Sequence, residues 1–214
     1  MIALRFVSAL TLVLICAPAF AADRIEMSII RNKEHIGTHG ISIVRDGARL
    51  HVDTRVEIAV MMAFVTVYRM LKTSRETWER DRVVAYDATI DDNGTVSTIK
   101  VRPVGKNLVI EGPGGRVTAP LGTMISGYWS ERTVERKLLI DSSDGVLRHV
   151  SVGTATREKL AAGNRVIPVR RFRMTGDLKR DLWYGEDGRL VRMREVASDG
   201  SVIVTELTGL SRKE

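Results

Sequence analysis

The clearest pattern in the chain is the alternation of apolar and polar positions across residues 50–58. In this stretch, LHVDTRVEI, apolar residues and one threonine occupy the even-numbered positions, whereas a histidine and charged residues occupy the odd-numbered ones. A strand points successive side chains to opposite faces, so a period of two is typical of a strand with one wet face. A helix with this pattern would scatter its apolar groups around the axis. The stretch therefore predicts a half-buried β-strand.

Turn signals recur at short intervals along the rest of the chain. Asn-Gly and Asp-Gly adopt positive φ at low cost and suit tight hairpins, so the strands between them should pair antiparallel. The turn signals lie at residues 35–37, 46–47, 91–94, 112–115, 144–145, 187–188 and 199–200. The predicted strands lie at 24–32, 38–45, 48–59, 63–73, 75–90, 95–103, 106–111, 134–140, 146–153, 165–176, 178–185, 189–197 and 201–209. The pattern predicts a mainly antiparallel β protein.

Two short helices are also expected. Thr156 can cap a helix over residues 156–162, and Gly163-Asn164 can end it. A second, more interrupted candidate covers residues 121–128.

Residues 1–21 are typical of a cleavable secretory signal peptide. Arg5 supplies the positive charge, residues 6–17 carry none, and Ala19-Phe20-Ala21 forms a small-x-small cleavage site. A lipoprotein signal also ends in a cysteine, but it requires a small residue in front, where this chain has Ile15 before Cys16. We expect an exported, periplasmic protein with a single β-rich domain over residues 22–214.

Cleavage removes Cys16, which is the only cysteine of the chain. Disulfides, thiol catalysis and thiolate metal sites are thereby excluded from the mature protein. The longest later apolar stretch, residues 58–65, is too short to span a membrane, so no transmembrane anchor is expected. Removing Arg5 lowers the formal charge from +7 to about +6, a balance that favours loose contact with anionic surfaces.

Short motifs in a fixed order give the chain a resemblance to a known family. They are Ile36-Gly37-Thr38-His39, Asp46-Gly47, Val67-Tyr68-Arg69, Glu76-Thr77-Trp78, Asp91-Asp92-Asn93-Gly94, Tyr128-Trp129, Leu138-Leu139-Ile140, Asp144-Gly145, Leu182-Trp183-Tyr184 and Asp187-Gly188. This order resembles an uncharacterised family of exported bacterial proteins, a domain of unknown function. The resemblance spans residues 24–208. One departure is that residues 70–75 lack the histidine that the family carries before its Glu-x-Trp motif.

The resemblance implies a fold and a compartment. The family is distantly similar to the half-open β-barrels of periplasmic lipoprotein carriers, in which a curved antiparallel sheet wraps around a helix-bearing segment. It implies a curved meander that forms a half-open barrel with one or two short helices. It carries over no catalytic residues.

Catalytic, cofactor and metal sites find little support in the residues. His35 and His39 are about 13 Å apart on an extended chain, too far to share one ion. His39 shares strand parity with Ile41, so we expect it to point inward as a satisfied polar residue; a ligand or catalytic base is the alternative. The acidic turn at 91–94 lacks the ligand spacing of a calcium loop, and neither a nucleophile elbow nor a phosphate-binding loop occurs. We therefore predict no catalytic residue, no cofactor and no metal.

Two groups of side chains could bind a ligand. For the aromatic and adaptable apolar residues, core packing on one side of the sheet and surface support on the other is the favoured interpretation, and the lining of an apolar cavity is the alternative. The candidate cavity residues are Met62, Phe64, Tyr68, Trp78, Trp129, Trp183 and Tyr184. Arginines are dense between residues 165 and 194, where a solvated sheet face is the default interpretation and a patch for phosphate or carboxylate groups is the alternative. The candidate patch residues are Arg170, Arg171, Arg173, Arg192 and Arg194.

The favoured hypothesis is a non-enzymatic binding or carrier protein for an apolar or amphipathic ligand with an anionic, lipid-like group. The alternative is an envelope protein that docks a protein partner through a sheet edge or the arginine-rich face. A hydrolase is the third hypothesis, and nucleic acid is not expected as a partner because no recognition motif appears.

Overall fold

The computed structural model describes residues 23–162 and 165–209, so the predicted signal peptide at 1–21 lies outside the described residues. The first eight strands are β1 (Asp23–Arg31), β2 (Glu34–Asp46), β3 (Arg49–Met62), β4 (Val65–Glu79), β5 (Arg82–Asp92), β6 (Thr95–Val104), β7 (Asn107–Gly112) and β8 (Gly115–Pro120). The rest are β9 (Met124–Ile125), β10 (Leu138–Ile140), β11 (Leu147–Val152), β12 (Thr156–Ala162), β13 (Arg165–Gly176), β14 (Arg180–Gly185), β15 (Leu190–Val196) and β16 (Val202–Gly209). One 3-10 helix, η1, covers Glu131–Glu135.

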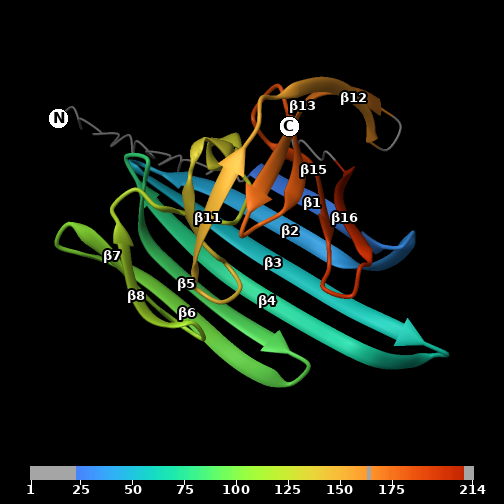
Figure 1. The fold of residues 1–214 in the computed structure, drawn as a ribbon, viewed down its shortest axis with the longest axis horizontal. Coiled ribbons are helices and arrows are strands. Elements are labelled where there is room, and N and C mark those ends of the chain that lie inside the picture. Colours follow the sequence, from blue (N-terminus) through green and yellow to red (C-terminus); the bar gives the residue numbers. More distant parts are fainter. Residues whose placement is uncertain (1–22, 163–164, 210–214) are drawn as a thin grey trace, which may run out of the picture.

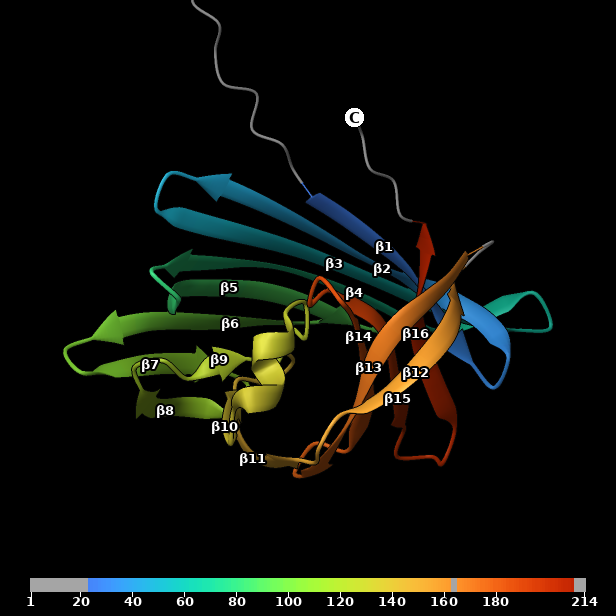
Figure 2. The ribbon, with the colours of Figure 1, turned by 90° about the horizontal axis from the view of Figure 1, so that it is seen from above.

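The strands form one curved sheet that does not close. Its order runs β8-β7-β6-β5-β4-β3-β2-β1-β16-β15-β14-β13-β11-β10-β9, with β12 paired to β13 outside this path. Neighbours pair antiparallel except β9 and β10, which are parallel. Figure 1 shows the long strands β1 to β6 side by side, and Figure 2 shows the sheet curling around the segment that carries β9, η1 and β10. The prediction of a mainly β, half-open barrel is confirmed.

The alternating stretch at residues 50–58 lies in β3, as predicted. Val52 is buried in the barrel interior, while Arg55 and Glu57 on the other face are exposed. Rows of inward residues continue across the sheet through the strand register; one row joins Ile41, Thr54, Ser74, Ala88 and Ile99. The apolar core therefore forms on the concave side.

The prediction of helices at residues 156–162 and 121–128 is wrong. Residues 156–162 form β12, because every residue from Thr156 to Ala162 pairs with β13 and this pairing overrides the helical propensity of Lys159 and its neighbours. Residues 121–128 contain turns and β9. The described helix is η1, which Ser130 caps by accepting a hydrogen bond from the backbone N–H of Arg132.

Two predicted turns are also misplaced. Residues 35–37 lie inside β2, where a Cβ added at Gly37 would come within 1.9 Å of the Glu57 carbonyl oxygen. Gly37 is therefore required for close approach of two backbones rather than for a turn. The break predicted between residues 73 and 75 occurs instead at Arg80-Asp81, two residues with positive φ that carry no glycine or proline signal.

No helix among residues 23–162 and 165–209 is long and apolar enough to cross a membrane.

Candidate functional site

A fully enclosed carboxylate, that of Glu76, lies at the centre of the barrel. Glu76 follows Lys72 and precedes Trp78 on the inward face of β4, since residues two apart share a face of a strand. The indole N–H groups of Trp78 and Trp129 both donate to its Oε2, at 2.9 and 3.2 Å. The two indoles meet edge to face with ring centroids 5.7 Å apart. Burial raises the pKa of the Glu76 carboxyl to about 7, against the opposing effect of the two indole hydrogen bonds and Lys72.

Lys72 connects the sheet to the segment inside it. Its Nζ donates to the Ser142 hydroxyl at 2.6 Å, and the Tyr86 hydroxyl donates to the Ser142 carbonyl oxygen at 3.0 Å. The Ser142 backbone N–H donates in turn to the Ser126 hydroxyl at 3.0 Å. Burial lowers the pKa of Lys72 to about 8. The network therefore satisfies the polar backbone of the inner segment by using strands β4 and β5.

A lysine beside a serine hydroxyl is also the pairing of serine–lysine hydrolases. Lys72 and Ser142 are each only 9% exposed, and Glu76 is 2% exposed. None of the five principal pockets on the described residues is lined by any of the three. Lys72 and Ser142 are thus enclosed, and their hydrogen bonds join the sheet to the inner segment.

His39 points into the same interior from β2. It is buried, but its Nε2 has no hydrogen-bond partner among the described residues, so the expectation of a satisfied side chain is not met at this atom. Burial, and secondarily the nearby charge of Lys72, lowers its pKa to about 4. His39 is thus a neutral inward histidine, and the described residues contain no group of three His, Cys, Asp or Glu side chains that could hold a metal ion.

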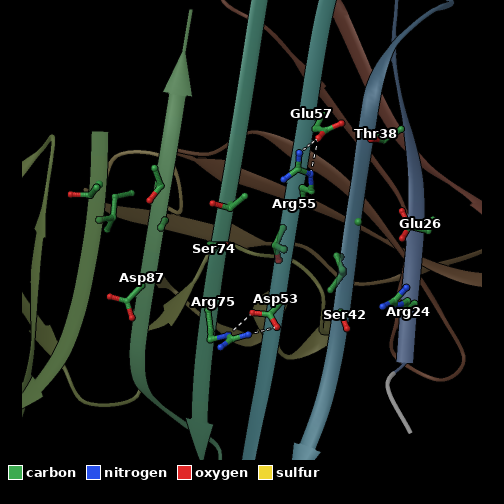
Figure 3. Close-up of a pocket in the computed structure, with 18 of the residues that line it drawn as sticks. Arg24, Glu26, Thr38, Ser42, Asp53, Arg55, Glu57, Ser74, Arg75 and Asp87 are labelled. Atoms are coloured by element: carbon green, nitrogen blue, oxygen red, sulfur yellow. Dashed lines mark hydrogen bonds and ion pairs between the residues drawn. The ribbon is translucent and has the colours of Figure 1, made fainter. Parts of the chain in front are cut away.

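The opposite, outer face of β1 to β6 carries a hollow of about 770 Å³ (Figure 3). One row across it alternates in charge, because the strand register aligns residues of opposite sign. That row is Arg24, Ser42, Asp53, Arg75, Asp87 and Lys100. The next row is small and hydroxylic at Gly40, Thr73, Thr89 and Thr98, and it also carries Glu26 and Arg55. Small side chains between charged rows make the floor of this outer groove.

Ion pairs hold parts of the outer groove in place. Arg75 donates to Asp53 at 2.6 and 2.9 Å, and Arg55 donates to Glu57 (Figure 3). A second hollow of about 580 Å³ adjoins the first and shares Thr38 and Glu57 with it. The lining of this second hollow mixes the apolar residues Ile58, Ala59, Met70 and Leu71 with the charged residues Glu57, Arg69 and Asp91.

The candidate aromatic cavity residues lie in separate places. Trp78, Trp129 and Tyr184 pack in the interior, where the Tyr184 hydroxyl donates to the Tyr128 carbonyl at 3.1 Å. Trp183 faces the other side of β14, donates to Glu158 at 2.8 Å and lies 5.1 Å from the Arg171 guanidinium. Tyr68 lies half-buried near the free end of β4, and Phe64 is 96% exposed at the β3–β4 turn; Met62 ends β3.

Four of the five patch arginines come together on the outer face of β13 to β15. Arg171, Arg173 and Arg194 surround Asp181 at 3.2, 3.4 and 3.7 Å. Arg192 pairs with Glu206 beside them at 2.6 Å, and a hollow of about 690 Å³ adjoins Trp183, Arg192 and Arg194. Arg170 has the opposite parity and pairs with Glu131 of η1.

The sequence profile of the domain of unknown function DUF6134 matches residues 27–208. The chain belongs to this family. A search of curated proteins found no match to it.

The DUF6134 domain shares its fold with a solved structure, that of a β-barrel-like protein of the domain of unknown function DUF1849 from Brucella abortus. The TM-score is 0.57 with 11% sequence identity, over 90% of this chain and 97% of the other. At that identity the likeness concerns the fold, which both proteins build as a barrel-like sheet.

Sequence reasoning missed the enclosed network of this DUF6134 domain. The sequence pattern indicates Trp78 and Trp129 as aromatic candidates, but it does not connect Glu76, Lys72 and Ser142 with them. A usable signal exists in the sequence: Lys72, Glu76 and Trp78 share one parity on β4, so charged residues accompany an apolar one on the same face. The outer groove is harder to predict from the sequence, because its row of alternating charges forms only when neighbouring strands pair in one particular register.

Proposed function

We propose that this DUF6134 protein is an exported, non-enzymatic binding protein that holds an amphipathic ligand on the outer face of β1 to β6. The observation that supports it most is the pair of adjoining hollows of about 770 and 580 Å³. The first is lined by hydroxyls and charges of both signs, and the second adds apolar side chains beside Glu57, Arg69 and Asp91, so together they offer polar and apolar contacts to an amphipathic ligand. Ligand sites are concave, with a few polar groups that fix orientation.

The packed interior favours an outer site over an enclosed one. Tyr86, Tyr184, Leu139 and Ile140 have no exposed surface and fill the space beside the Glu76 network. The non-enzymatic part of the proposal rests on the enclosure of Lys72 and Ser142. The periplasmic location rests on the signal-like residues 1–21.

Charges of both signs on the outer groove favour a zwitterionic or mixed polar group. Arg24, Lys100 and Glu26 line the hollow and form no salt bridge among the described residues, so charges of both signs are open to a ligand, whereas Asp53 and Asp87 are paired with Arg75 and Arg102. A phosphocholine-type group offers both a negative and a positive centre to such a row. Lysophosphatidylcholine is therefore the probe that we would use.

The test is a titration of the mature chain with lysophosphatidylcholine monomers, followed by backbone amide NMR. Binding in the outer groove shifts the amides of Thr73, Thr89 and Leu71 and leaves buried Leu182 unmoved. Thr73→Trp fills the floor of the groove and should weaken binding, while Thr118→Trp on exposed β8 should not. Equal binding by both variants, or shifts confined to other faces, contradicts the proposal.

A further inference from the structure

The tip of the β3–β4 hairpin extends beyond the rest of the sheet. In the described part of the chain, the pairing of β2 with β3 ends at Gly37–Ile58. The pairing of β5 with β4 ends at Asp92–Met70. Beyond these pairs, β3 and β4 continue to pair with each other up to Met62–Val65. Figures 1 and 2 show this hairpin projecting past its neighbours. At about 3.3 Å per residue, the four residues from 59 to 62 extend roughly 13 Å.

This projecting ribbon is apolar on both of its faces. Residues 58–68 contain no charged side chain, whereas residues 50–58 of the same strand alternate between apolar and polar. Met61, Val65 and Val67 are exposed, with 59%, 63% and 47% of their surface accessible. Isolated exposed apolar residues are ordinary on a protein, but a contiguous group at the end of a projection marks an interaction site.

The turn itself presents an aromatic ring outward. Ala63 and Phe64 take φ values of 46° and 69°, and Phe64 is 96% exposed. A bulky residue rarely adopts positive φ, and Asn-Gly would suit this two-residue turn better. Packing within the chain does not account for the phenylalanine, since almost all of its surface is free.

Polar groups of both signs surround the foot of the hairpin. Arg69 and Asp92 lie where β4 and β5 begin to pair, and burial raises the pKa of the Tyr68 phenol, assisted by a hydrogen bond with Asp92, to about 12. Lys33 and Glu34 are exposed at the neighbouring β1–β2 turn. A tyrosine at the base of an apolar segment, with mixed charges beside it, complements the zwitterionic headgroups that cover a hydrocarbon layer.

We propose that the β3–β4 hairpin tip, residues 61–67, inserts into the surface of a phospholipid layer. The insertion is shallow, because both edges of the projecting ribbon carry unpaired backbone groups, and these are costly in the hydrocarbon core. Phe64, Val65 and Met61 reach the acyl boundary while the foot stays among the headgroups. Since the foot carries both signs of charge, binding does not require anionic lipid. A protein groove would cover one face of the ribbon, whereas this ribbon is apolar all round.

The experiment is flotation of the mature chain with phosphatidylcholine vesicles. The double variant A63N/F64G installs a favoured turn and removes the ring. We expect partitioning to fall at least about tenfold, because burial of a phenylalanine side chain is worth more than one tenfold step in affinity. Its thermal stability should be equal or higher, which separates loss of binding from loss of fold. Val104→Ser removes an exposed apolar residue at the β6–β7 turn and should partition as the unmodified chain does.

A second readout reports depth directly. Phe64→Trp should show a blue-shifted emission on vesicles and quenching by lipids brominated near the headgroup end of the acyl chain. Addition of phosphatidylglycerol to the vesicles should change binding little. Unchanged flotation of A63N/F64G, or formation of a dimer through the tip with no vesicle binding, overturns the proposal. Because the probe is a vesicle and the site is the tip, failure here leaves the titration of the outer groove unaffected.

Discussion

Replacement of Glu76 by glutamine should stabilise the protein in a pH-dependent way. The pKa of the Glu76 carboxyl is about 7 in the fold against an ordinary 4.5, because burial disfavours the ionised form. Each pKa unit corresponds to about 1.4 kcal/mol, so ionisation of Glu76 costs the folded state about 3 kcal/mol. A raised pKa means stability that is fully present below pH 4.5 and is lost as the pH rises through about 7.

Glutamine keeps the hydrogen bonds but removes the titration. Trp78 and Trp129 both donate to one oxygen, Oε2, so a single amide oxygen can accept both. The difference in the free energy of unfolding between Glu76→Gln and the unmodified chain should therefore grow by roughly 2 kcal/mol, in favour of the variant, between about pH 5 and about pH 8.5. The part of this free-energy difference that does not change with pH depends on how the amide N–H₂ fits beside Gly127. The change of the difference with pH is therefore the quantity that tests the argument.

The assay is urea unfolding followed by tryptophan fluorescence across this pH range. Trp78 and Trp129 contact the substituted side chain and report on the site itself. Glu111→Gln, on an exposed side chain that forms a loose pair with Arg116, is the matched control and should give a difference independent of pH. The reasoning would be refuted if the difference in the free energy of unfolding between Glu76→Gln and the unmodified chain did not change with pH, or if it fell as the pH rises.

Two further substitutions test the packing and the charges around these sites. Gly127→Ala places a Cβ 2.6 Å from Oε1 of the Glu76 carboxylate, whose other oxygen accepts from two indoles, so thermal unfolding should show a loss of about 1–3 kcal/mol. Gly153→Ala, with nothing within 4 Å of its added Cβ, should be close to neutral. Asp181→Asn leaves the surrounding arginines without their shared, largely buried carboxylate, so it should destabilise the chain by about 1–3 kcal/mol, and more at low salt than at high salt; a loss that does not depend on salt contradicts the shared role of Asp181.

The sequence predicts most of the fold because its strands have a readable period. The alternation at residues 50–58 recurs as the two faces of β3, and the glycine-containing turns after Asp46 and Asn93 lie where hairpins form. The failures have a common cause. Arg80-Asp81 turns the chain without glycine or proline, and Gly37 lies in a strand because of a backbone from a residue 20 positions away. Both depend on tertiary neighbours that a local pattern does not contain.

The candidate sites were less predictable than the fold, for a similar reason. Four of the five patch arginines meet because β13, β14 and β15 are adjacent, and the sequence density already suggested this. The outer groove depends on the register of six strands, and a shift of one residue in one strand would break its charge row. The contact between Lys72 and Ser142 joins residues 70 positions apart and has no local signal.

In most proteins charged residues are exposed and apolar residues are buried, and the hairpin formed by β3 and β4 departs from this distribution in two places. Lys72 and Glu76 are charged residues enclosed near the middle of β4, whereas Met61, Phe64, Val65 and Val67 are apolar residues exposed at the free end of the hairpin. The enclosed Lys72 holds the inner segment in place through Ser142, so the interior of the barrel is filled by side chains. A ligand can then bind only at the outer surface or at a projecting hairpin. The effects of the enclosed charges and of the exposed apolar tip should then be independent of each other. Glu76→Gln should keep the vesicle partitioning of the unmodified chain, and A63N/F64G should keep the pH dependence of unfolding that Glu76 produces. If either variant disturbed both properties, the tip and the interior would be coupled, and a rigid filled barrel would no longer explain the separation of scaffold from binding surface.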